Sequence, residues 1–161
     1  MVPSRLWCEL LLGLSIVSLV PGCLPPDEPA KKPKPVDDLV HTWIVADHIL
    51  GKGSSLTPAE AVGFHGRTIE ITVTGYTSPW QGSCDEASRT TRKRTLAEVV
   101  DELEISPSAE GEATAFGLTT ALTEYRLACN DQKKPPPLLV YTSNGKAMTC
   151  FNAVCYLMKQ F

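Results

Sequence analysis

The stretch LLVYTSNGKAMTCFNAVCYLMKQF, residues 138–161, decides the fold class of this chain. Three apolar, β-prone segments follow one another here, separated by the dipeptides Asn144-Gly145 and Asn152-Ala153. Asn-Gly is the dipeptide most favoured by the two-residue turn of a β-hairpin, and Asn-Ala can form a turn of the same length. The stretch therefore predicts a three-stranded antiparallel meander.

The second turn also predicts a disulfide. A two-residue turn at Asn152-Ala153 makes Phe151 and Val154 the hydrogen-bonded pair beside it and places Cys150 opposite Cys155. At such a non-hydrogen-bonded pair the side chains lie closest, within reach of an S–S bond. Zinc binding is the rival interpretation, but the sequence offers no second cysteine pair with the usual C-x₂₋₄-C spacing.

Upstream of the meander, two segments carry the start signal of a short helix. In each, a threonine at the N-cap is followed three residues later by a glutamate, the arrangement called a capping box. The pairs are Thr57 with Glu60 and Thr95 with Glu98. The sequence therefore predicts two short helices, one ending at Gly63 and one running past Leu103.

Three further segments, 39–46, 67–75 and 121–129, have the β-branched or alternating pattern of strands. In the segment 67–75, the alternation predicts that Ile69, Ile71 and Val73 share a buried face. We expect a mainly β fold with two short helices (α+β), built on an antiparallel, twisted sheet.

Residues 1–22 have the anatomy of a signal peptide, with Arg5 near the start and an apolar region from Leu10 to Val20. That region is much shorter than the roughly 20 residues that a transmembrane helix needs. Val20, Gly22 and Cys23 resemble the lipobox of bacterial lipoproteins, which implies acylation of Cys23, for example with palmitate, and cleavage before it. An ordinary secretory signal is the alternative.

Residues 23–38 would then be the acylated cysteine and a tether. The tether contains five prolines and three lysines with almost nothing apolar between them, a composition that favours extended polyproline conformations over a packed core. The resemblance implies a cell-envelope protein held to the membrane by its lipid. Leu24 after the cysteine favours the outer membrane, with the protein facing the periplasm.

Residues 39–161 have the length of one β-rich domain. A formal charge of −3 is too small to indicate a nucleic-acid partner. With Cys8 in the leader and Cys23 acylated, Cys84 and Cys129 remain after the hairpin pair is assigned and are expected to form a second disulfide. No cofactor is predicted.

The domain resembles the calycin or lipocalin-like class, in particular small bacterial lipoproteins with such a domain. The features that carry the resemblance are Trp43 in the first strand, the segment Gly66-Arg67-Thr68 and the loop SPWQGSC at 78–84. The resemblance implies a small or incomplete barrel that ends in the meander.

Catalytic and metal sites find little support in the sequence. His41 and His48 are seven residues apart, a spacing of no common metal site. Ser54 and Ser55 lie in a glycine-containing loop that lacks the G-x-S-x-G and Walker spacings. The acidic residues 98–104 fit the solvated face of a helix. We therefore predict no catalytic residue, no metal ligand and no enzymatic activity.

Two features suggest binding. The segment 88–94 gathers four basic residues, which either contact phosphates or protect an edge strand from pairing. Trp80, in a loop beside a cysteine, is either an exposed contact residue or a ring folded over the barrel mouth. The predicted binding residues are Tyr76, Trp80, Arg89, Arg92, Lys93 and Arg94.

Two functions follow as hypotheses. The first is a non-enzymatic envelope lipoprotein that binds an unknown protein or small amphiphilic ligand at a barrel end. The second is a periplasmic inhibitor or immunity protein that blocks a lysozyme or competitor toxin with a loop such as Thr142–Lys146. A deep apolar cavity would favour the first hypothesis, and a filled barrel with a protruding turn would favour the second.

Overall fold

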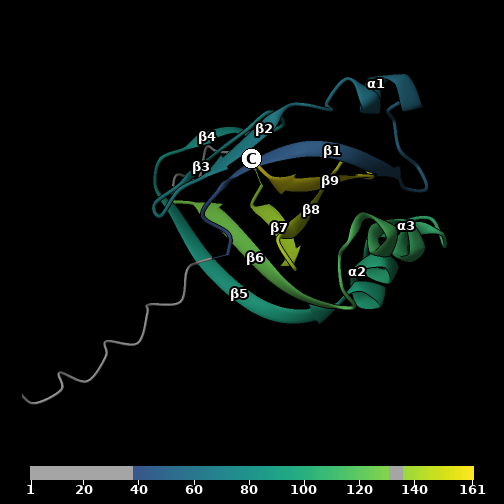
Figure 1. The fold of residues 1–161 in the computed structure, drawn as a ribbon. Coiled ribbons are helices and arrows are strands. Elements are labelled where there is room, and N and C mark those ends of the chain that lie inside the picture. Colours follow the sequence, from purple (N-terminus) through teal and green to yellow (C-terminus); the bar gives the residue numbers. More distant parts are fainter. Residues whose placement is uncertain (1–37, 131–135) are drawn as a thin grey trace, which may run out of the picture. The chain divides into compact units, whose positions relative to one another are not determined.

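The computed structural model describes residues 38–130 and 136–161, which form one nine-stranded antiparallel sheet and three short helices (Figure 1). The signal peptide, Cys23 and all of the predicted tether except Asp38 lie outside the described residues. Among the residues that the structure describes, no helix is long and apolar enough to cross a bilayer.

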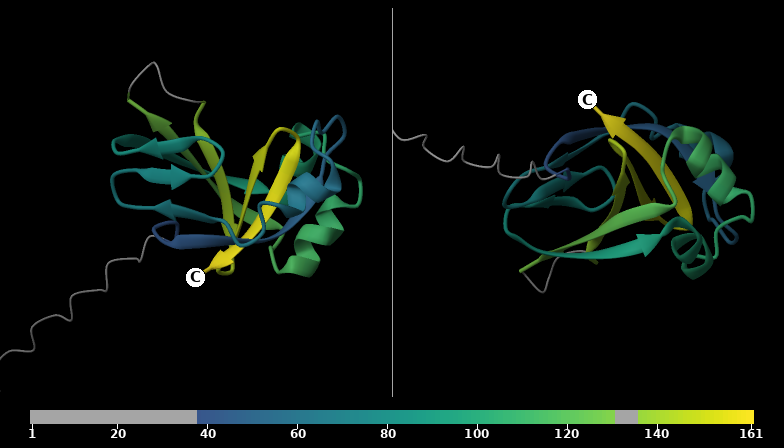
Figure 2. Two further views of the ribbon diagram at one scale, coloured as in Figure 1. Left: turned by 90° about the horizontal axis from the view of Figure 1, so that it is seen from above. Right: turned by 60° about the horizontal axis from the view of Figure 1, so that its bottom comes forward.

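Neighbouring strands of the sheet follow the order β4-β3-β2-β1-β9-β8-β7-β6-β5, and the sheet curls into a nearly closed barrel (Figure 2). The predicted fold class is therefore confirmed. The strands are β1 (Thr42–Leu50), β2 (Thr68–Ile71), β3 (Tyr76–Ser78), β4 (Gly82–Cys84), β5 (Ala87–Thr95), β6 (Ala121–Cys129), β7 (Leu138–Ser143), β8 (Lys146–Phe151) and β9 (Val154–Gln160).

The C-terminal meander forms in the predicted register. Asn152 and Ala153 have φ values of 51° and 58°, the left-handed geometry of a type I′ turn, and Asn144-Gly145 has the same geometry. Cys150 therefore lies opposite Cys155, and the two are joined by a disulfide, as predicted.

The second predicted disulfide, Cys84–Cys129, is also present and brings the two edges of the sheet together. It joins β4, which pairs only with β3, to β6, which pairs with the edge strand β5. The backbone adds to this closure, because Ala87 N donates to Thr74 O at 2.8 Å.

Both predicted capping boxes are present, at the starts of α1 (Pro58–Val62) and α2 (Leu96–Glu102). A third helix, α3 (Ala109–Phe116), was not predicted. Ser108 at its N-cap makes no side-chain cap hydrogen bond, and its only buried residues are Ala109 and Ala113, so neither a start signal nor a large apolar stripe announces it.

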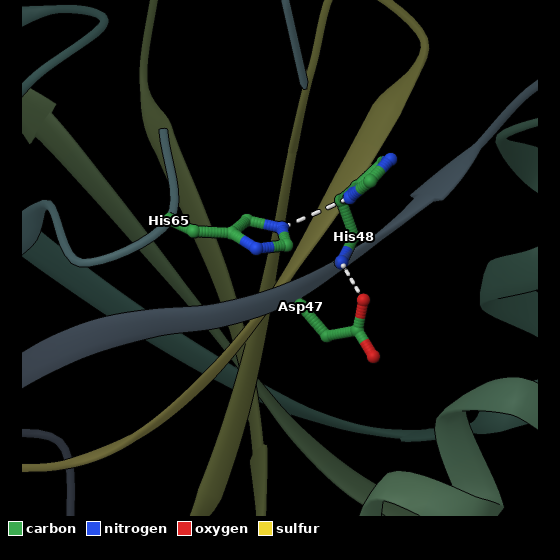
Figure 3. A group of neighbouring side chains, drawn as sticks. All are labelled: Asp47, His48 and His65. Carbon is green, nitrogen blue, oxygen red and sulfur yellow. Dashed lines mark hydrogen bonds between the residues drawn. The ribbon is translucent and has the colours of Figure 1, made fainter. Parts of the chain in front are cut away.

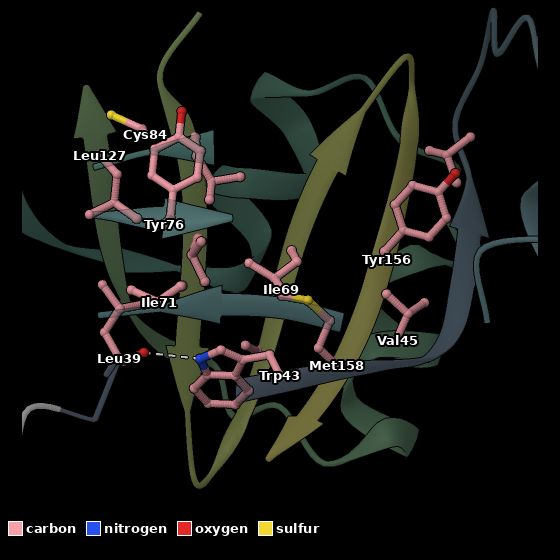
Figure 4. Packing of buried hydrophobic residues seen from close by; sticks show 14 of the residues in the cluster. Leu39, Trp43, Val45, Ile69, Ile71, Tyr76, Cys84, Leu127, Tyr156 and Met158 are labelled. Carbon is pink, nitrogen blue, oxygen red and sulfur yellow. Dashed lines mark hydrogen bonds between the residues drawn. The ribbon is translucent and has the colours of Figure 1, made fainter. Parts of the chain in front are cut away.

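Side chains fill the inside of the barrel (Figure 4). Trp43, Tyr156 and Met158 are fully buried there, and Trp43 Nε1 donates to Leu39 O at 3.0 Å. Helices α2 and α3 pack against residues of the other face of the sheet and form a second core with Ile49, Leu157 and their neighbours. The sheet is therefore covered on both faces over β1 and β6–β9, whereas the side chains of β5 stay partly or fully exposed.

One strand prediction fails at its end. Strand β2 stops at Ile71, and Val73 is 80% exposed instead of buried. Thr72 and Gly75 close the β2–β3 turn by hydrogen bonds to each other, and a side chain at Gly75 would collide with the Cys84 carbonyl. The alternating pattern thus continues in the sequence beyond the point where turn contacts end the strand.

Candidate binding site

Trp80 lies at one end of the barrel, in the tight turn between β3 and β4. Its ring is half-buried and stacks on Tyr156 with centroids 4.4 Å apart and planes 27° apart. Phe64, in the segment after α1, and Phe151, at the end of β8, lie 5.5 Å and 6.4 Å from it. We call these four residues the aromatic cluster. Of the two arrangements considered for Trp80, the structure shows the ring folded over the barrel end.

Unpaired polar atoms accompany this cluster. Trp80 Nε1, Tyr156 Oη and Gln81 Oε1 are buried, and none has a hydrogen-bond partner among the described residues. Burial raises the pKa of Tyr156, and an interaction of hydrogen-bond type with Trp80 lowers it, so these two groups are close without meeting full hydrogen-bond geometry. A buried polar group that stays unpaired costs about 1–3 kcal/mol, so these three atoms are the positions in the cluster where an ordered water would stabilise most.

The cavity beside Trp80 is small. Its volume is about 50 Å³, and Trp80, Gln81 and Phe151 are among its lining residues. Small-molecule sites have volumes of roughly 300–1,000 Å³. This cavity therefore accommodates a water molecule or two but no lipid tail.

A larger groove of about 390 Å³ adjoins the cluster, between the end of α2 and the β8–β9 hairpin, and Cys150 and Phe151 line both it and the small cavity. Its apolar lining includes Leu103 and Ile105, and Lys52 and Glu104 are exposed at it. We call it the hairpin groove. It is lined by Lys52, Glu102, Leu103, Glu104, Ile105, Cys150, Phe151, Asn152, Ala153 and Cys155.

Backbone strain gathers at the hairpin groove. Among the described non-glycine residues, four have positive φ, and three of these, Glu104 (49°), Asn152 (51°) and Ala153 (58°), line the groove. The left-handed region costs an L-residue other than Asn or Asp roughly 1–2 kcal/mol. Two contacts hold this geometry, because Gly51 N donates to Ala153 O at 2.7 Å and Gly51 forms a bridge with Ile105. Glu104 and Ala153 therefore carry this cost, whereas Asn152 adopts the geometry readily.

Tyr76, a predicted binding residue, lies inside the barrel. It is 3% exposed, and its Oη is 3.7 Å from Cys129 Sγ of the bridge that closes the barrel. Burial raises the pKa of its hydroxyl. In this position Tyr76 packs in the core, where a partner cannot reach it without opening the sheet.

The four basic residues of β5 are divided between the two faces of the strand, because neighbouring side chains on a strand point to opposite sides. Arg92 and Arg94 both bind the buried carboxylate of Glu124, at 2.6 Å and 3.1 Å. Arg94 also pairs with Glu102 of α2 at 2.6 Å. Arg94 therefore anchors α2 to the sheet, whereas Arg92 ties β5 to β6. Hydrogen bonds raise the pKa values of both, to Glu124 for Arg92 and to Glu102 for Arg94.

On the other face, Arg89 Nη2 donates to Thr72 O at 2.9 Å, and Lys93 Nζ donates to Thr123 Oγ1 at 2.8 Å. The end of β5 pairs with the start of β6, next to the β7–β8 turn. Trp80 lies near the opposite end of β7, because Gln81 Nε2 beside it donates to Pro136 O just before β7 begins. The structure therefore does not bring Trp80 and the basic residues at the end of β5 together in one surface.

Sequence patterns gave no indication of the groove or of the other members of the aromatic cluster. Phe64 lies in a turn, and Tyr156 and Phe151 belong to strands whose apolar residues all suit a core. The only local signal was Ala at the second position of a type I′ turn, where Gly is the usual residue. No known family model, curated protein or solved structure matches this chain.

Proposed function

We propose that this chain is a non-enzymatic lipoprotein of the cell envelope that binds a protein partner in the hairpin groove beside the aromatic cluster. The observation that carries the proposal is an open groove with an apolar lining and a strained backbone, next to a barrel whose interior is filled. The same proposal includes a lipid anchor at Cys23 and a location on the periplasmic side of the membrane.

The filled interior favours a protein partner over a small amphiphile. Trp43, Tyr156 and Met158 are fully buried along the barrel, and the cavity beside Trp80 measures only about 50 Å³. An acyl chain held in a lipocalin-like manner needs an empty barrel. The ligand of this domain must therefore bind at its outside.

The hairpin groove has the composition of a protein interface. Such interfaces combine an apolar centre with a polar rim. Leu103, Ile105 and Phe151 provide the apolar centre here, and exposed Lys52 and Glu104 lie at the rim. A partner segment with one apolar side chain would fill the centre, while the disulfide-linked hairpin provides a rigid wall.

The inhibitor hypothesis has one specific observation in its favour, at the opposite end of the barrel. Asn144 and Gly145 form an exposed turn next to a cavity of about 310 Å³ that is lined by Thr142 and Lys146, among others. A filled barrel with an exposed turn is the arrangement expected for a protein that blocks an enzyme. The β7–β8 turn is therefore the second candidate contact surface.

Site-specific photocrosslinking in cells distinguishes the two surfaces. Full chains would carry p-benzoylphenylalanine at Lys52 in the groove, at Asn144 in the turn or at Val73, an exposed loop residue, as the control. We expect a discrete protein adduct from position 52 and none from position 73. An adduct from position 144 alone would support the inhibitor hypothesis, and the same adducts from all three positions would contradict both.

The membrane anchor is tested separately. Because acylation needs the Cys23 thiol, Cys23→Ser should move the protein from the membrane pellet to the soluble fraction of disrupted cells. A variant that stays in the pellet as fully as wild type would contradict the anchor and leave the groove proposal untouched.

A further inference from the structure

Three side chains at the edge of the aromatic cluster form a cluster of metal-ligand type. Asp47 and His48 follow a β-bulge in β1, where the register with β9 shifts between Val45 and Asp47. His65 lies in the segment after α1, directly after Phe64. Figure 3 shows the two imidazoles pointing toward each other, with the Asp47 carboxylate below His48.

The bulge is what brings these groups together. It places Asp47 opposite Leu157 and His48 opposite Tyr156, so His48 shares a face of the sheet with Tyr156 of the aromatic cluster. His48 N donates to Asp47 Oδ1 at 2.8 Å, so the carboxylate lies beside the histidine. His48 Nδ1 and His65 Nε2 are 2.9 Å apart.

The distances suit a shared ion. One ligand atom from each of the three residues lies within 4.8 Å of the other two. Two imidazole nitrogens on a tetrahedral Zn²⁺ are about 3.4 Å apart, given Zn–N distances of about 2.0–2.1 Å. The rings therefore need to separate by only about half an ångström, and exposed Asp47 can rotate toward the ion.

Two carboxylates act on this place. Burial and then His65 lower the pKa of His48, whereas Asp47 and Glu112, from α3, act on it in the opposite direction. We propose that Asp47, His48 and His65 form a binding site for a divalent transition-metal ion of the zinc type. Two imidazoles and one carboxylate leave a fourth position for water, as in open zinc sites.

Metal binding at this site would act on the aromatic cluster. It would join the segment after α1 to β1, and Phe64, next to His65, packs on Tyr156 with centroids 5.3 Å apart. The ion would thus hold Phe64 against Tyr156 and the Trp80 ring stacked on it. This inference does not depend on the hairpin groove being a binding site.

The test is a zinc titration of the purified full chain, prepared without a polyhistidine tag and stripped with EDTA. With Zn²⁺ at a hundredfold excess over its dissociation constant, the melting temperature of a domain of this size should rise by about 8 °C. His48→Gln and His65→Gln should each abolish this shift. His41→Gln is the matched control, because His41 lies against Trp43 away from the cluster, and it should retain the full shift.

Isothermal titration calorimetry on the same four proteins gives the stoichiometry, and one Zn²⁺ per chain is expected for wild type and for the His41 variant. A second probe, Co²⁺, reports geometry through the visible absorption of tetrahedral cobalt, independently of stability. The proposal is overturned if wild type binds no Zn²⁺. It is also overturned if both glutamine variants fold and bind Zn²⁺ as wild type does.

Discussion

Replacing Trp80 with alanine tests whether the aromatic cluster closes the end of the barrel. Removing a buried Trp ring typically costs about 3–5 kcal/mol, and the half-buried position of Trp80 puts its loss near the lower limit, about 3 kcal/mol. The variant also removes the buried, unpaired Nε1, and this offsets about 1 kcal/mol of the loss. The free energy of unfolding should therefore fall by about 2 kcal/mol.

For a domain of this size, that loss lowers the melting temperature by roughly 6 °C. Circular dichroism melts and guanidinium titrations of wild type, Trp80→Ala and Trp80→Phe measure it. Trp80→Phe keeps a ring on Tyr156 and removes the unpaired N–H, so it should stay within about 1 kcal/mol of wild type. Val73→Ala, in an exposed loop, is the surface control and should change nothing measurable.

Two results would refute this reasoning. A melting temperature of Trp80→Ala within about 2 °C of wild type would mean that the ring does not pack on Tyr156. A Trp80→Phe variant as unstable as Trp80→Ala would mean that the indole N–H has a hydrogen-bond partner after all.

The remaining predictions concern the disulfides, the turns and pH. Loss of the Cys84–Cys129 bridge, by paired alanine substitution, should lower the free energy of unfolding by about 4 kcal/mol, and loss of Cys150–Cys155 by about 2 kcal/mol, because the first bridge closes the longer loop. Guanidinium titration measures both losses, and an equal or larger loss for Cys150–Cys155 would contradict the loop-length argument. Ala153→Gly should stabilise the domain by about 1 kcal/mol in thermal melts and Gly145→Ala should destabilise it similarly, since both positions have positive φ; the same sign for both would contradict this. Burial, and then His65, lower the pKa of His48 in the folded state below 6.5. With EDTA present, the free energy of unfolding should therefore be highest above pH 6.5 and should fall as the pH drops from 6.5 toward the folded-state pKa. In thermal melts at the same pH values, His48→Gln should lack this loss.

Local sequence signals predicted much of this fold. The capping boxes at Thr57 and Thr95 depend only on residues three positions apart, and each helix starts where its box predicts. The type I′ turn at Asn152 sets the register of its hairpin, and the register in turn places Cys150 beside Cys155. Such features are decided within a few residues, so a sequence can show them.

Features that depend on distant contacts were not predictable in this way. Val73 continues an alternating pattern but lies outside the strand, because a turn closed by Thr72 and Gly75 ends β2 before it. In the sequence, Arg92 and Arg94 look like part of an exposed basic strip, but in the structure both bind Glu124 of β6. Arg94 also pairs with Glu102 and so holds α2 on the sheet.

The candidate sites were still less visible in the sequence. His48 was considered with His41, at a spacing that suits no metal, whereas its neighbour in the structure is His65. The segment after α1 and a β-bulge in β1 bring these two together, and no sequence pattern predicted the bulge. The hairpin groove likewise combines residues from β8, β9 and the segments after β1 and α2, and only the folded barrel places them side by side.

The claim that a protein partner occupies the hairpin groove is tested most directly by the dissociation constant of the partner identified by crosslinking. Isothermal titration calorimetry would compare wild type with Leu103→Ala, in the apolar centre of the groove, and with Val73→Ala as the control. We predict binding about tenfold weaker for Leu103→Ala, or about 1.4 kcal/mol, and unchanged for Val73→Ala. Equal dissociation constants for all three proteins, each shown to be folded, would contradict the claim.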